Sequence, residues 1–89
     1  MRRTVKKILD GDTFIVNRKV NGSNKIRLSN VNAPERGRRG ASTATNTLRG
    51  LVGGKTITLQ PKARSYDRIV ADVRVNRRSV NKRMRDKGY

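Results

Sequence analysis

Alternating apolar and polar positions in the first third of the chain predict β-strands joined by tight turns. Between Thr4 and Val16, β-branched residues alternate with polar ones, and Asp10-Gly11-Asp12 interrupts the pattern, so we expect two strand segments joined by a turn or bulge. The pair Asn21-Gly22 separates two further alternating segments and favours a hairpin because both residues tolerate positive φ. The pattern predicts strands at Thr13–Val20 and Lys25–Val31.

A longer apolar period marks a helix in the middle of the chain. From Ala41 to Val52 the apolar residues recur at steps of three and four, which predicts an amphipathic helix. Gly53-Gly54 would cap its end. The preceding segment, Glu35–Gly40, is basic and contains glycine, so we expect an irregular loop there.

The second half of the chain repeats the change from strand to helix. The alternation predicts strands at Lys55–Gln60 and Arg68–Val75, with a loop at Pro61–Asp67 between them. Asn76–Arg78 is expected to form a tight turn. Val80–Lys87 places apolar residues on one face and ends before a glycine, which predicts a short C-terminal helix.

The order of these elements favours a mainly β (α+β) fold. Three strands, a helix, two strands and a second helix fit a small five-stranded Greek-key barrel of the OB-fold type, in which a helix plugs one end. A closed barrel also removes exposed sheet edges. A two-layer α+β sandwich is the alternative. The 89 residues allow one domain, spanning 1–89, which buries only about 60% of the surface of its unfolded chain.

Composition narrows the classes of function. The chain carries 23 Lys and Arg against 6 Asp and Glu, a net charge of +17, and such a field attracts polyanions, chiefly nucleic acid and secondarily anionic membrane. It has no Cys and no His, which excludes disulfides, thiolate or imidazole zinc sites and Ser-His-Asp triads. Any metal must bind through oxygen. The apolar runs are too short to span a bilayer and no signal peptide is visible, so we expect a cytoplasmic protein by default.

The few acidic residues are informative because they are scarce. Asp10, Asp12 and Glu35 flank the two loops nearest the first hairpin. Carboxylate oxygens from a turn and a strand end can converge on a hard divalent cation. Taken alone, however, Asp10-Gly11-Asp12 is more often an Asp-Gly turn than a metal site, because short motifs match frequently by chance.

Four ordered fragments resemble one known family. They are DGDTF at 10–14, IRLSNVNAPE at 26–35, YDRIVADV at 66–73 and the VN at 80–81. In this order they resemble the staphylococcal-nuclease-like, or thermonuclease, family, and the likeness covers nearly the whole chain. The resemblance implies an OB-type barrel. The chain departs from the family in that we expect it to lack the family's last C-terminal helix. It also implies calcium-dependent hydrolysis of the phosphodiester bonds of DNA and RNA, with little sequence specificity.

The resemblance implies a role for four retained residues. Asp12 falls on the family's first metal carboxylate, Arg27 and Arg68 on its two catalytic arginines, and Glu35 on its catalytic glutamate. The chemistry is consistent, because guanidinium groups and a divalent cation can stabilise the highly charged pentacoordinate phosphorus species. Glu35 would orient or deprotonate the attacking water.

The remaining metal positions depart from the family pattern. Asn32 stands where the family has a metal-binding Asp, and Ala33 stands where a backbone carbonyl completes the site. An amide removes one negative charge from the ligand set, so we expect one calcium ion that binds weakly without substrate. Asp10 is a possible neighbour of that site. Asp67 replaces a common glycine and could pair with Arg68, reducing its availability.

The expected partner is DNA or RNA, with single strands favoured, and the chain is expected to act as a monomer. Tyr66 could stack on a base or close the site over a phosphate. Further phosphate contacts are expected from a set of basic loop residues, namely Arg36, Arg38, Arg39 and Arg64. The alternative is a non-catalytic OB-fold binder, but such proteins use stacking aromatic side chains and this chain has two Tyr and one Phe. A membrane partner is supported only by the basic composition of the chain.

Overall fold

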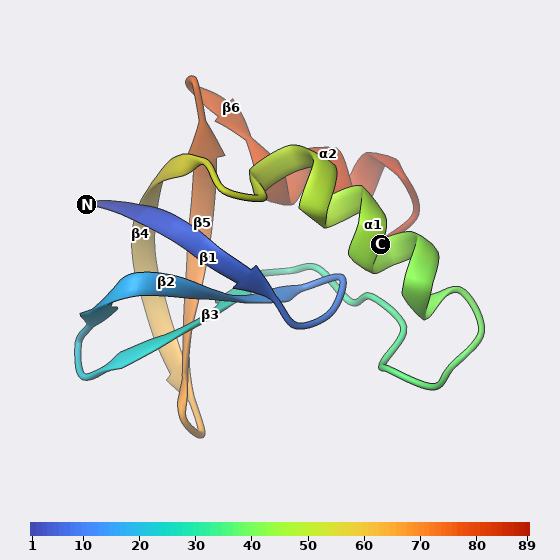
Figure 1. Ribbon diagram of the computed structural model, residues 1–89, viewed down its shortest axis with the longest axis horizontal. Helices are drawn as coiled ribbons and strands as arrows, with labels where there is room; N and C mark the ends of the chain where they lie inside the picture. The colour runs from blue at the N-terminus through green and yellow to red at the C-terminus, as the bar shows by residue number, and fades with distance from the viewer.

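The computed structural model describes all residues, 1–89, as one small barrel with two helices (Figure 1). The chain runs through three strands, a helix, two long strands, a short strand and a second helix. In order these are β1 (Arg2–Ile8), β2 (Thr13–Val20), β3 (Ser23–Leu28), α1 (Ala41–Val52), β4 (Thr56–Ser65), β5 (Arg68–Val75), β6 (Arg78–Ser79) and α2 (Val80–Asp86).

Pairing between β3 and β5 closes the sheet into a barrel. The strands lie in the order β3-β2-β1-β4-β5, and β3 also pairs with β5, in parallel, whereas the other neighbours are antiparallel. This is the expected OB-type Greek-key barrel of five strands, with β6 as a short extension of β5. The fold prediction is confirmed, and the two-layer sandwich is wrong.

Alternate residues of the strands fill the barrel, and the helices pack on it. Phe14, Ile26 and Leu28 are fully buried in the core. The predicted apolar face of α1 is buried, and α1 packs against β1 and α2, while α2 packs against β5 (Figure 1). Neither helix is long and apolar enough to cross a membrane.

The predicted loop at Pro61–Asp67 is wrong, because most of it belongs to β4. The strand continues to Ser65, which lies opposite Arg68, and only a two-residue turn separates β4 from β5. Proline has no N–H to donate to the ladder. The register of β4 against β5 shifts between Pro61 and Ala63, and this bulge accommodates the missing donor.

Two other boundaries differ from the sequence prediction. β3 spans Ser23–Leu28 instead of 25–31, because the chain turns away at Ser29 and Asn30. The turn predicted at 76–78 contains only Asn76 and Arg77, both with positive φ. Arg78 already begins β6, a strand that the sequence did not indicate.

A buried asparagine ties α2 to the barrel wall. Asn81 is 2% exposed, and its Oδ1 accepts a hydrogen bond from the Val73 N–H at 2.8 Å. Its Nδ2 donates to the carbonyls of Ser29 at 2.9 Å and Ala71 at 3.1 Å, and also to the Ser29 hydroxyl. These bonds fix the chain where it leaves β3, just before Asn32.

Candidate active site

The barrel register places the two predicted catalytic arginines on one face. Arg27 on β3 lies opposite Thr13 on β2 and next to Val70 on β5. Side chains two residues apart on a strand share a face, so Arg68 lies on the same side as Val70. Lys25 shares the face of Arg27 for the same reason. Residues about 40 positions apart in the chain therefore come together.

The turn before β2 is held close to the segment that follows β3. The Asp12 N–H donates to Asp10 Oδ1 at 3.0 Å, and the Asp12 carbonyl accepts from the Leu28 N–H at 2.8 Å. Gly11, between Asp10 and Asp12 in the turn, is buried. A Cβ at Gly11 would lie 2.5 Å from the Ala33 Cβ and 2.6 Å from the Ala44 Cβ, so the close approach of this turn, the 32–33 segment and α1 requires glycine.

Asp12, Arg27 and Asn32 form one cluster of contacts. Arg27 Nη2 donates to Asn32 Oδ1 at 3.1 Å and lies 3.5 Å from Asp12 Oδ2. Its other terminal nitrogen donates to the Leu28 carbonyl at 2.8 Å. The Ala33 N–H donates to Asp12 Oδ2 at 3.3 Å. The guanidinium group therefore lies between the two oxygen donors that the sequence predicted as metal ligands.

The carboxyl group of Asp12 is crowded by a second carboxyl group. Burial raises the pKa of Asp12 above its ordinary value, and the neighbouring side chain of Asp10 raises it further. The Thr13 hydroxyl, which donates to Asp12 Oδ1 at 2.9 Å, and the charge of Arg27 lower the pKa of Asp12. A divalent cation would relieve this crowding, because it favours the ionised form of both carboxyl groups.

Arg68 lines a shallow depression of about 350 Å³ together with Asp10, Lys25 and Tyr66. Its guanidinium group makes no hydrogen bond or ion pair within the chain, so its donors are available to a ligand. The predicted pairing of Asp67 with Arg68 is wrong. Asp67 pairs with Lys25 at 2.9 Å, and this hydrogen bond lowers the pKa of Asp67.

Glu35 lies on the exposed loop between β3 and α1. Its carbonyl accepts a hydrogen bond from the Arg38 N–H at 2.9 Å, while its carboxylate contacts no other polar side chain. The structure thus brings Asp12, Arg27 and Asn32 into direct contact. The carboxylate of Glu35, three residues after Asn32 in the sequence, is not part of these contacts.

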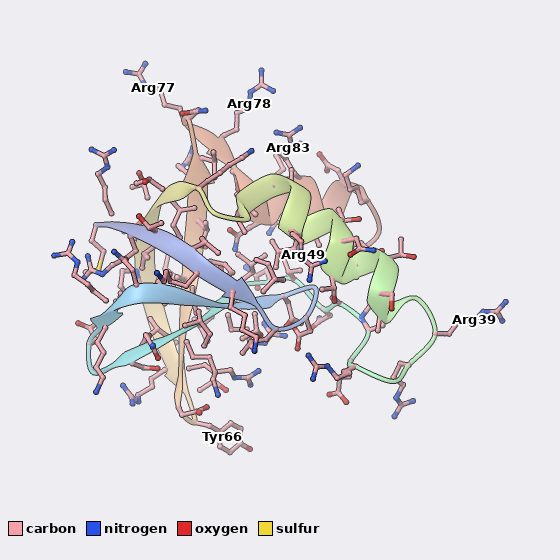
Figure 2. The ribbon with its side chains drawn as sticks, viewed as in Figure 1. Arg39, Arg49, Tyr66, Arg77, Arg78 and Arg83 are labelled. Carbon is pink, nitrogen blue, oxygen red and sulfur yellow. The ribbon has the colours of Figure 1, made fainter.

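The predicted nucleic-acid-binding residues lie in two separate regions, the β4–β5 hairpin and the loop before α1. Tyr66 is 90% exposed at the tip of the β4–β5 hairpin (Figure 2), and Arg64 on β4 donates to the Asn21 carbonyl at 2.9 Å. Arg38 and Arg39 are exposed on the loop before α1, and Figure 2 shows Arg39 projecting away from the barrel.

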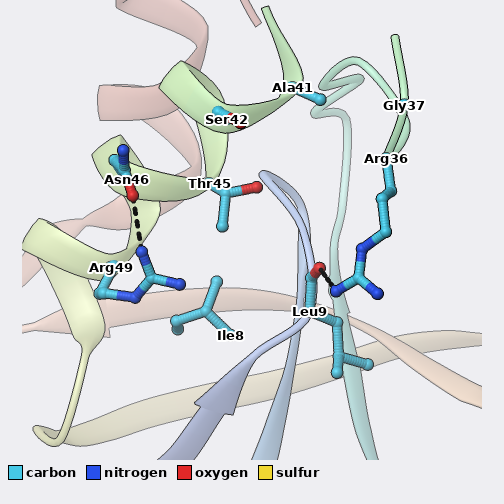
Figure 3. Close-up of a pocket in the computed structure, with 9 residues that line it drawn as sticks. All are labelled: Ile8, Leu9, Arg36, Gly37, Ala41, Ser42, Thr45, Asn46 and Arg49. Carbon is cyan, nitrogen blue, oxygen red and sulfur yellow. Dashed lines mark hydrogen bonds between the residues drawn. The ribbon is translucent and has the colours of Figure 1, made fainter.

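Arg36 lies at the edge of a pocket of about 290 Å³ between the end of β1, this loop and α1 (Figure 3). Its Nη2 donates to the Leu9 carbonyl at 3.4 Å. Arg49 lines the opposite side, where its Nη1 donates to Asn46 Oδ1 at 2.6 Å. Arg36, the residue that follows Glu35 in the sequence, and Arg49 both line this pocket. The pocket therefore offers two cations to a phosphate group.

The sequence prediction missed Lys25 and Arg49 as members of these surfaces. Lys25 could have been found from its spacing, because it lies two residues before Arg27 on the same strand. Arg49 belongs to the polar face of a helix, where an exposed arginine is unremarkable, so no local signal distinguishes it. Its position depends on how α1 packs against β1.

The oxygen donors at the site fit a hard divalent cation. Two carboxylates, Asp10 and Asp12, and the amide oxygen of Asn32 are the kinds of ligand that calcium prefers. The carboxyl groups provide the charge, and the chain offers no thiolate or imidazole ligand because it lacks Cys and His. Arg27 competes for the same oxygens. The predicted carbonyl contribution of Ala33 stays a prediction, since only its N–H contacts Asp12.

Comparison with known proteins gives two matches. A family model described as staphylococcal nuclease homologue matches residues 25–89, a range that contains Arg27, Asn32, Glu35 and Arg68. A curated protein of Haemophilus influenzae, named as an uncharacterized endonuclease, is 35% identical over 85 residues. The match covers 94% of this chain and 48% of that relative. The chain therefore spans about half the length of the curated relative.

Proposed function

Because the chain belongs to the family of staphylococcal nuclease homologues, we propose that it hydrolyses phosphodiester bonds in nucleic acid with little sequence specificity. The observation that carries this proposal is the convergence of Asp12, Arg27 and Asn32 in one set of contacts, with Arg68 on the same face of the barrel. An enzyme of this class needs positive charge where a phosphate gains negative charge, and this face supplies it.

The arginines act on the phosphate. Arg68 has no protein partner and can donate to the phosphate oxygens directly, and Arg27 reaches the same face from the neighbouring strand. Their donors stabilise the additional negative charge of the pentacoordinate species. Glu35, whose carboxylate is free, accepts a proton from the water as the water oxygen bonds to phosphorus. The bond from phosphorus to the leaving sugar oxygen breaks, and solvent protonates that oxygen.

In this proposal Asp12, Asn32 and the backbone of Ala33 would hold a calcium ion, and Asp10 would be a neighbouring negative charge. Bound there, calcium supplies a second centre of positive charge for the transition state. With an amide in place of a carboxylate at position 32, the free protein would bind the ion weakly, and a substrate phosphate would strengthen that binding.

Single-stranded DNA or RNA is the proposed substrate. The exposed ring of Tyr66 beside Arg68 suits an unpaired base, which can stack on an aromatic side chain while its phosphate contacts the arginine. The basic residues around the pocket shared by Arg36 and Arg49 extend this surface toward α1.

A second candidate function is nucleic-acid binding without catalysis. It is favoured by one specific contact, the hydrogen bond from Arg27 to Asn32, which places a guanidinium group where a metal ion would otherwise bind. A binder of this kind needs the cations of the face but no metal.

Restoring a carboxylate at Asn32 separates the two functions. Asn32→Asp adds negative charge beside Asp12, so we expect the calcium concentration for half-maximal cleavage to fall by roughly tenfold or more. Asn24→Asp makes the same isosteric change at an exposed position of β3 and should leave it unchanged. The measurement is a calcium titration of the cleavage rate on a single-stranded oligonucleotide. An inactive wild type with no gain in Asn32→Asp would favour the binder.

The two arginines should respond differently to substitution. Arg68→Gln should lower kcat by about 10²–10³-fold without changing stability, because its guanidinium group has no protein partner. Arg27→Gln should cause a similar loss of kcat and also destabilise the fold by about 1–3 kcal/mol, because it leaves the carboxyl group of Asp12 without its cation.

The loss of stability caused by Arg27→Gln should depend on pH. The pKa of Asp12 is raised in the folded state, so its ionised form costs stability at neutral pH, and this cost disappears as pH falls through the folded pKa. Arg27→Gln raises that pKa further. Urea unfolding should therefore show a smaller deficit for Arg27→Gln at acidic pH than at pH 7. An equal deficit at both pH values would contradict the role assigned to Arg27.

A further inference from the structure

A second cationic hollow lies on the opposite end of the barrel from Tyr66. It has a volume of about 520 Å³ and is formed where the last turn of α1, the start of β4, the β5–β6 turn and α2 meet. Figure 2 shows Arg77, Arg78 and Arg83 projecting from this end, with Tyr66 at the other. The lining residues are Gly50, Leu51, Lys55, Val75, Asn76, Arg78, Val80 and Arg83.

The hollow combines an apolar floor with a cationic rim. Leu51 and Val75 are half-buried and pack against the core, and Val80 is 2% exposed. The rim carries Lys55, Arg78 and Arg83 without an acidic residue among them. The size falls within the roughly 300–1,000 Å³ of pockets that hold small ligands.

None of the three rim cations has a partner within the chain. The side chains of Lys55, Arg78 and Arg83 donate no hydrogen bond and form no ion pair, although they are exposed. The acidic residue of α2, Asp86, is paired with Lys82 at 2.9 Å. Three uncompensated like charges around one hollow repel each other, and an anion placed among them relieves that repulsion.

The hollow is too far from Arg68 to contact the same phosphate group. Arg68 begins β5 and Val75 ends it, so at about 3.3 Å per residue the two ends are about 23 Å apart along the strand. That distance corresponds to roughly seven stacked nucleotides at about 3.4 Å each. Only a polymer can occupy both places at once.

We propose that this hollow is a second binding site for the sugar-phosphate backbone of nucleic acid, which anchors a long strand while another part of it lies at Arg68. The rim contacts phosphate groups, and the apolar floor accommodates the sugar or an unpaired base. This proposal rests on the proposed function only in taking nucleic acid as the polymer. Binding to the hollow can be tested without cleavage.

The test compares two pairs of arginines that carry equal charge. Arg78→Gln with Arg83→Gln removes two rim cations and keeps the aliphatic stems that cover the floor. Arg2→Gln with Arg18→Gln removes the same charge from exposed side chains on β1 and β2 that do not line the hollow. The probe is a single-stranded DNA of 30 nucleotides, titrated at several salt concentrations with chelator present so that nothing is cut.

The slope of log affinity against log salt concentration should be smaller in magnitude by about 1.4 for the rim variant, since each lost phosphate contact on a single strand removes about 0.7. If the variant and wild type bind equally at 1 M salt, this corresponds to roughly 25-fold weaker binding of the long strand by the variant at 0.1 M. The control variant should keep the wild-type slope. An equal reduction in both variants would mean that binding depends on net charge alone, and it would overturn the proposal, as would an unchanged rim variant.

A trinucleotide provides an independent comparison, because it cannot reach from Arg68 to the hollow. Its cleavage by the rim variant should equal that by wild type, while KM for the long strand rises. A parallel loss on both substrates would overturn the proposal. If wild type cleaves neither substrate, the proposed function fails, and the salt slopes with chelator still decide whether the hollow binds nucleic acid.

Discussion

Replacing Glu35 with Gln is expected to lower kcat by about 10²–10⁴-fold while single-stranded DNA still binds. The carboxylate of Glu35 is exposed and contacts no polar side chain, so the isosteric amide disturbs no interaction of the fold. It removes the group that accepts a proton from the attacking water. Single-turnover cleavage with saturating enzyme would separate this chemical step from binding, which fluorescence anisotropy would measure in chelator.

Asp86→Asn is the matched control for that change. It also converts a carboxylate to an amide, on the exposed face of α2, and should alter the cleavage rate by less than the scatter between preparations. If Glu35→Gln cleaves as fast as Asp86→Asn, Glu35 is not the proton acceptor. If Glu35→Gln instead loses binding of single-stranded DNA, the role of Glu35 is to contact the substrate.

Replacing Asn81 with Leu is expected to destabilise the fold by about 2–5 kcal/mol, because buried groups that it now satisfies would lose their partners. The Val73 N–H and the Ser29 carbonyl both depend on this side chain. The loss is a large part of the roughly 5–15 kcal/mol that stabilises a domain of ordinary size. Urea unfolding followed by circular dichroism would measure it.

Asn24→Leu at an exposed position of β3 serves as the control and should change stability by less than about 0.5 kcal/mol, because the Asn24 side chain makes no hydrogen bond. The Asn81 variant should also lose activity beyond its loss of folded protein, because Ser29 lies just before the segment that carries Asn32. A stability change as small as that of Asn24→Leu would contradict the role of Asn81 as the link between α2 and the barrel.

Local pattern was sufficient to predict most of the barrel. The alternation in β2 and β5 and the three-four spacing in α1 gave both the elements and their order, and this order fits few folds other than an OB-type barrel. The segment at 61–65 could not be predicted in this way. Pro61 is typical of a loop, and only the pairing of β4 with β5 reveals the bulge that allows it inside a strand.

The site was predictable where its residues are close in the sequence or belong to a motif. The contacts among Asp12, Arg27 and Asn32 follow from a turn and a strand end that the motifs placed together. The pairing of Asp67 with Lys25 did not follow, because it depends on the parallel register of β3 with β5. That register joins residues separated by 42 positions, and no short-range pattern encodes it.

The most direct measurement of the central claim is cleavage of a labelled single-stranded oligonucleotide by wild type, with calcium and with chelator, at substrate in large excess over protein. The account predicts repeated turnover with calcium, none with chelator, and none above background for Glu35→Gln purified in the same way. Wild type that does not cut in calcium, or cutting that persists equally in Glu35→Gln, would contradict it.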